Sequence, residues 1–145
     1  MPPQPFPAEH PLLFLAIFAV VMIATSYGTA AITGWSTLAR VYPSEGGLLG
    51  ARVWHGQSAR MRYRTRYNRG VNIAANHHGI ELSVFFLIRL GHPPLFIPWS
   101  DIHTEPAKGW IFDYVRFSFR RASPWIMLRR DVAEEVLGVR SLSPT

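Results

Sequence analysis

The sequence predicts a single N-terminal transmembrane α-helix followed by a small antiparallel β domain that ends in a C-terminal helix. Three observations support this prediction. From Pro11 to Ala39 there is no charged residue, which is typical of a membrane span. After Gly47 apolar and polar residues alternate, as they do in strands. Near the C-terminus apolar residues recur at helical spacing.

Composition sets the outer limits of this prediction. The chain has 145 residues, a formal net charge of +6 and no cysteine. Its length suits one modest domain. Without cysteine the sequence can form no disulfide, thiolate zinc site or cysteine nucleophile. The fifteen Lys and Arg residues all lie at or after Arg40.

The transmembrane helix is predicted at Leu12–Ile32. Lipid cannot satisfy free backbone groups, so a span must be helical, and about 20 residues rise about 30 Å. A cleaved signal peptide is the alternative, but it would have a positive n-region and a shorter apolar core. The positive-inside rule places the C-terminal domain in the cytoplasm and the N-terminus outside a bacterial inner membrane. The protein is thus expected to be single-pass.

The segments on either side of this helix have their own signatures. Residues 1–11 are rich in proline and should be extended. His10, at the outer edge, is expected to be an interfacial cap, and a role as pigment or haem ligand stays open. Residues 33–49 are predicted to be an interfacial segment and linker. Trp35, Arg40 and Tyr42 are assigned there to the membrane interface, where such residues are enriched.

Residues 50–140 are predicted to form the soluble domain, with a tail at residues 141–145. Val53 and Trp54 are candidate core residues of a first strand. The final helix is expected to have Asp131 as its N-cap and to end at Gly138. Further strands are predicted around Val71–Ala75, Ile80–Ile88, Leu95–Trp99, Trp110–Phe119 and Trp125–Leu128.

One of these strands is apolar on both faces. Phe85 and Leu87 lie opposite the stripe formed by Ile80, Leu82 and Val84. A second apolar face must be covered by the helix, the bilayer or another subunit. We therefore assign Phe85 and Leu87 as a candidate protein contact.

Two stretches together resemble a known family. GIELSVFFLIR begins at Gly79 and PPLFIPWSDI begins at Pro93. They resemble the core of membrane-anchored bacterial PH-like domain proteins, and they are similar to uncharacterised single-span bacterial proteins with an HPPL-x-IPW core. The resemblance implies a PH-like β-meander or barrel and no enzymatic reaction. No phosphoinositide pocket can be matched to this sequence.

Arginine recurs at every second position in SARMRYRTRYNRG, which begins at Ser58. On a strand these arginines would share one face, while Met61, Tyr63 and Tyr67 would take the other. The row could be a charged exterior, a contact for anionic lipid headgroups or a contact for an acidic partner. Nucleic acid is disfavoured, because no groove-reading helix or RNP pattern accompanies the row. The residues assigned to lipid or partner binding are Arg60, Arg62, Arg64, Arg66 and Arg69.

The sequence gives little sign of catalysis. Ser100, Asp101 and His103 are neighbours along the chain, and a triad requires spatial convergence instead. The adjacent His77 and His78 come without an HExxH pattern, and nucleotide-binding and nucleophile-elbow motifs are also missing. We therefore predict that the protein is no enzyme and has no metal or cofactor.

These patterns together suggest an interaction protein. The first hypothesis is an accessory or scaffold subunit that packs on a larger integral membrane complex, such as a photosynthetic or respiratory assembly. Its transmembrane helix and PH-like domain would make the protein–protein contacts. The alternative is a membrane-surface module that binds anionic lipid through the arginine row.

Overall fold

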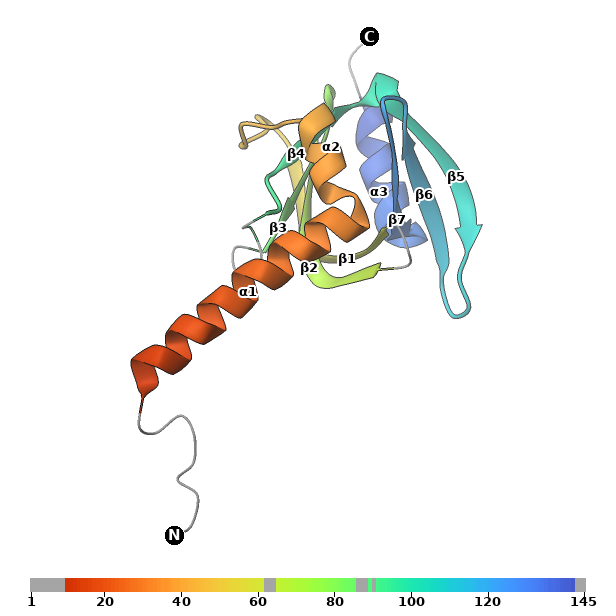
Figure 1. Cartoon of the computed structure of the whole chain (residues 1–145). Coiled ribbons are helices and arrows are strands. Elements are labelled where there is room, and N and C mark those ends of the chain that lie inside the picture. Colours follow the sequence, from red (N-terminus) through yellow and green to blue (C-terminus); the bar gives the residue numbers. More distant parts are fainter. Residues whose placement is uncertain (1–9, 62–64, 86–88, 90, 143–145) are drawn as a thin grey trace.

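The computed structural model describes residues 10–61, 65–85, 89 and 91–142. A long apolar helix leads into a seven-stranded antiparallel sheet, and a second long helix closes the chain (Figure 1). This order of elements confirms the predicted fold class.

Helix α1 (Pro11–Thr33) extends away from the rest of the protein (Figure 1). It begins with a proline, whose missing N–H would have no partner in the first turn. Its mean hydropathy reaches 2.1. By length and composition alone it could cross a membrane, and a signal sequence would have the same properties. Gly34, with φ of 88°, ends the helix.

Helix α2 (Trp35–Val41) follows Gly34 directly and packs against strand β7. Trp35, Leu38 and Tyr42 are fully buried in the core, whereas Arg40 is exposed. The placement of Trp35 and Tyr42 at the membrane interface is therefore corrected. Their rings contribute to the domain core because α2 folds back onto the sheet.

The sheet has the order β4-β3-β2-β1-β7-β6-β5. Strand β4 lies at one edge, as expected for a strand that ends in proline. A single 3-10 turn, η3 (Trp99–Asp101), links β4 to β5. The strands are β1 (Arg52–Met61), β2 (Thr65–Ala75), β3 (Gly79–Val84), β4 (Leu95–Pro98), β5 (Ile102–Lys108), β6 (Asp113–Phe119) and β7 (Ala122–Arg129).

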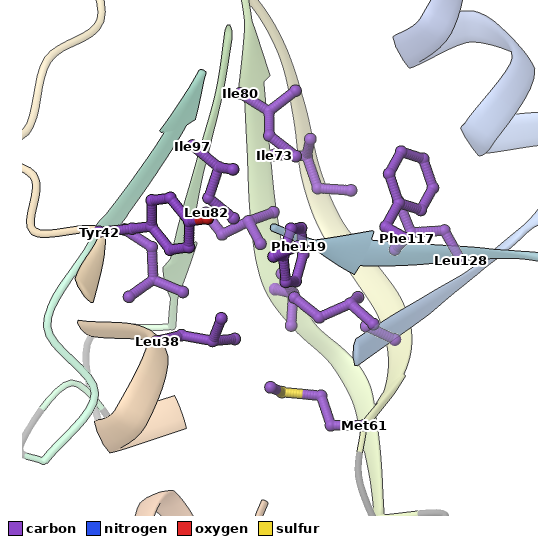
Figure 2. Packing of buried hydrophobic residues seen from close by; sticks show 14 of the residues in the cluster. Leu38, Tyr42, Met61, Ile73, Ile80, Leu82, Ile97, Phe117, Phe119 and Leu128 are labelled. Atoms are coloured by element: carbon purple, nitrogen blue, oxygen red, sulfur yellow. The ribbon is translucent and has the colours of Figure 1, made fainter. Parts of the chain in front are cut away.

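The core lies between the two halves of the sheet. Figure 2 shows Ile73, Leu82 and Ile97 from β2–β4 gathered with Phe117 and Leu128 from β6 and β7. The predicted alternation in β2 and β3 is confirmed, because every second residue is buried. Helix α3 (Arg130–Ser141) contributes further buried side chains to this core.

Several local predictions were wrong. Val53 was predicted to be a core residue, but its side chain is 46% exposed. Arg129, not Asp131, is the N-cap residue of α3; Asp131 lies in the first turn and pairs with Arg129 at 3.3 Å. Gly138 lies inside α3, which continues to Ser141. The predicted strand from Trp110 starts only at β6, because the preceding residues form a turn.

Candidate interaction surface

The arginine row does not lie on one continuous strand. It is divided between β1 and β2, at the end of the hairpin where these two strands connect. Strand β1 ends at Met61 and β2 begins at Thr65, its cross-strand partner. Arg60 is therefore directly opposite Arg66. Met61 and Tyr67 are buried, as predicted. The chain reverses direction, but directly opposed residues share a face, so the expected separation of charged and core side chains holds here.

The other predicted members of the row differ in their placement. Arg62 and Arg64 lie outside the described residues. Arg69 is exposed and has a φ of 49°. Its backbone N–H donates to Ser58 Oγ at 3.1 Å, near irregular pairing between β1 and β2. Arg69 therefore belongs to a bulge, which increases the local twist of the hairpin.

The strand register extends the charged face across five strands. Arg66 pairs with Arg60, Arg60 with Met127, Met127 with Arg116, and Arg116 with Glu105. Directly opposed residues point to the same face of a sheet. This row therefore lies on the face opposite the core. Sequence reasoning found only its β1–β2 part, since strand order cannot be read from spacing alone.

The strands and the β5–β6 turn enclose a groove of about 1010 Å³ over this row. We call it the basic groove. Among its described lining residues, Glu105 is the one carboxylate, and it accepts from Arg116 Nη1 at 3.4 Å. The basic lining residues are Arg60, Arg66, Lys108, Arg116 and Arg129.

Aromatic rings hold three of these guanidinium groups in place. Arg60 lies 4.8 Å from the centre of the Tyr114 ring. Arg116 lies 5.1 Å from Trp125, and Arg129 lies 4.4 Å from Phe112. Such contacts orient a guanidinium while leaving its edge N–H groups available. The groove therefore presents oriented donors that suit carboxylate or phosphate oxygens, although Arg116 and Arg129 also pair with Glu105 and Asp131 of the chain itself.

The β5–β6 turn forms an apolar rim to the basic groove. Trp110 is 100% exposed and Ile111 is 79% exposed. The turn is closed by the Gly109 N–H, which donates to the Phe112 carbonyl at 3.0 Å. A large aromatic residue at the tip of a hairpin is a typical anchor for a partner surface or a membrane interface.

A buried polar cluster joins α1 to the domain, and sequence reasoning missed it. Tyr67 OH lies 2.9 Å from Thr33 Oγ1 and 3.0 Å from His92 Nε2. His92 Nδ1 lies 3.3 Å from Ser26 Oγ. Burial raises the pKa of Tyr67, while its hydrogen bond with Thr33 opposes that shift. We call these four residues the junction cluster.

A sequence signal for this junction did exist. Ser26, Ala30 and Thr33 are spaced by four and three residues, so they lie on one face of α1. All three are buried. Small residues at this spacing allow close packing, and the rest of α1 is exposed except for the half-buried Met22 and Thr29. The pattern marks the face of α1 that contacts the domain.

The remaining candidate residues do not join these sites. Phe85 is 48% exposed, and Leu87 lies outside the described residues. Asp101 accepts from Tyr42 OH and from Arg121 Nε, each at 2.9 Å. The hydrogen bonds from Arg121 and then Tyr42 lower the pKa of Asp101. Asp101 thus connects η3, α2 and the β6–β7 turn.

Among the described residues, the histidines likewise form no cluster with acidic residues. The rings of His77 and His78 are 3.8 Å apart. Within the described ranges, His, Asp and Glu side chains do not gather in groups of three that could hold a metal ion. Comparison with protein-family models, curated proteins and solved structures found no match. The functional interpretation therefore rests on the geometry of the basic groove and the junction cluster.

Proposed function

We propose that the protein is a non-catalytic, membrane-anchored accessory subunit that docks on an integral membrane partner through the basic groove. The observation that carries this proposal is the direct joining of α1 to the domain. The anchor and the groove then move as one body. A subunit that must meet a neighbour in the same membrane gains from such a fixed orientation.

The rigidity follows from the contacts at the junction. Gly34 is the one residue between α1 and α2. On one side Thr33 bonds Tyr67 of β2, and on the other Trp35 Nε1 donates to the Pro93 carbonyl at 2.9 Å. A flexible tether would instead be polar and free of buried contacts. The same contacts favour retention of α1, since cleavage would expose the junction cluster.

The charge distribution supports a cytoplasmic domain. Lys and Arg are confined to the chain from Arg40 onward, and the positive-inside rule places that side in the cytoplasm. We therefore propose a single-pass protein of a bacterial inner membrane, with its N-terminus outside. The basic groove would face an acidic surface of the partner on the cytoplasmic side.

Anionic lipid headgroups are a second candidate ligand. The contact between Tyr67 and Thr33 brings the neighbouring Arg66 close to the end of α1. A basic residue near an acidic leaflet contributes about 1 kcal/mol of binding free energy. Several groove residues acting together could therefore hold the domain on the membrane without a protein partner.

Two matched triple variants separate these candidates. The groove variant changes Arg60, Arg66 and Lys108 to Gln. For docking on a partner, the groove variant should lose a co-migrating membrane protein in a native gel after detergent extraction. For lipid binding, it should lose flotation with anionic vesicles at low salt, because such binding is screened by salt.

The control triple variant removes the same number of charges elsewhere. It changes Arg52, Arg120 and Arg140 to Gln, and all three positions are exposed and outside the groove. It should behave like the wild type in both assays. If both variants lose binding to the same extent, the loss is explained by the lower overall charge, and specific binding through the basic groove is contradicted. A wild-type protein that always migrates as a free monomer would contradict the subunit proposal.

A further inference from the structure

The part of α1 that is free of the domain is too short to cross a bilayer. The first buried residue of α1 is Ser26. Pro11 to Thr25 is about 15 residues and rises about 22 Å, whereas a hydrocarbon core is about 30 Å thick. The missing length of about 8 Å corresponds to roughly five further residues of helix.

The missing length must come from the C-terminal part of α1. Glu9 precedes the helix, and a carboxylate is costly inside a membrane. In the other direction the outward-facing side chains are suitable, because Tyr27 is 55% exposed and Ile32 is 61% exposed. The span therefore includes the turns of α1 on which the domain packs.

Gly91 and His92, which lie between β3 and β4, pack on these turns. A Cβ at Gly91 would lie 2.9 Å from Tyr27 Cδ1 and 3.0 Å from Tyr27 Cα. The next residue, His92, is bonded to Ser26. Gly91 and His92 therefore lie at the level of the last turns of the span.

We propose that the described part of the connection between β3 and β4 (Phe85, Arg89 and residues 91–94) enters the cytoplasmic leaflet beside α1 and contacts the boundary between lipid headgroups and acyl chains. This inference rests on the proposed membrane anchoring and adds a second membrane contact. Exposed Phe85 supplies apolar surface. Exposed Arg89 has a side chain long enough to reach the headgroups.

Polar groups of His92 and Pro93, in the described part of the connection, are satisfied within the protein, as the membrane requires. Irregular backbone at membrane depth is tolerated where it is buried in protein. His92 is 1% exposed and is bonded to both Ser26 and Tyr67. The His92 N–H donates to the Arg89 carbonyl at 3.0 Å. The Pro93 carbonyl accepts from Trp35.

Site-directed spin labelling can test this inference directly. The chain has no cysteine, so each introduced cysteine takes a single label. The full-length protein in lipid nanodiscs would carry Phe85→Cys or Arg89→Cys as test positions, Val21→Cys within α1 as the membrane standard, and Leu142→Cys as the water standard. The measurement is collision of the label with oxygen, which enters lipid, and with a water-soluble nickel complex.

Labels at positions 85 and 89 should lose nickel collisions and gain oxygen collisions relative to the Leu142 position. Readings at both positions equal to the Leu142 position, with Val21 still in lipid, would overturn this inference alone. A Val21 label that collides with nickel as freely as the Leu142 label would overturn the membrane anchoring and this inference with it.

Discussion

Removing one hydroxyl from the junction cluster should measurably weaken the union of α1 and the domain. In Tyr67→Phe the ring still packs against Trp35, whose ring centre is 5.9 Å away. The variant loses the hydrogen bonds to Thr33 and His92. A buried hydrogen bond contributes about 0.5–1.5 kcal/mol net. Two of them predict a loss of about 1–3 kcal/mol in the free energy of unfolding.

Chemical denaturation of the full chain in mild detergent would measure this loss. The fluorescence of Trp35 is a suitable reporter, because its ring contacts both Tyr67 and His92. The matched control is Tyr27→Phe, at an exposed position of α1, which should change stability by less than about 0.5 kcal/mol. If the two variants are equally stable, the junction cluster does not hold α1 on the domain.

The raised pKa of Tyr67 also predicts how the free energy of unfolding changes at alkaline pH. Burial raises the pKa of Tyr67 above its ordinary value of 10.0, so the folded state disfavours the phenolate. The contribution of Tyr67 is therefore complete below pH 10.0 and is lost as the pH rises through the folded pKa. Tyr67→Phe should lose less stability than the wild type across that range. If the free energies of unfolding of the two proteins fall in parallel with rising pH, the raised pKa of the buried Tyr67 is contradicted.

Three further predictions concern other parts of the fold. Gly34→Ala should destabilise the protein by more than about 1 kcal/mol, because φ is 88° and a Cβ would lie 2.6 Å from Pro124 Cγ; an unchanged denaturation midpoint would refute this. Asp101→Asn should flatten the loss of stability in acid, since the pKa of Asp101 is lowered by Arg121 and its contribution disappears as the pH falls through that lowered pKa; an acid-unfolding midpoint equal to that of the wild type would count against this. Arg66→Thr should stabilise the protein by about 0.2–1 kcal/mol by removing a cross-strand like-charge pair, while weakening capture by acidic ligands; a stability loss would show that Arg66 is structural.

Local periodicity predicted those parts of the fold that depend on neighbouring residues. The alternation at Val71 and Ile73 identified strand faces because side chains alternate along any strand. The same reasoning failed for Trp35. Aromatic residues are enriched both at membrane edges and in cores, and only the packing of α2 on the sheet distinguishes the two.

The candidate sites were predicted only in part, for a related reason. Arg60 and Arg66 were assigned to one charged face, but Arg116 and Arg129 join them through the pairing of β1 with β7. That pairing connects residues more than sixty positions apart, so no short motif could reveal it. The junction cluster likewise depends on a contact between His92 and α1 that spans 66 positions.

Crosslinking in native membranes tests the central proposal most directly. A photoreactive phenylalanine analogue would replace Lys108 in the basic groove or, as the control, exposed Arg120 outside it. A docking subunit should form a covalent product with an integral membrane protein from position 108 and none from position 120. Products with lipid alone from position 108, or the same protein products from both positions, would contradict docking through the basic groove.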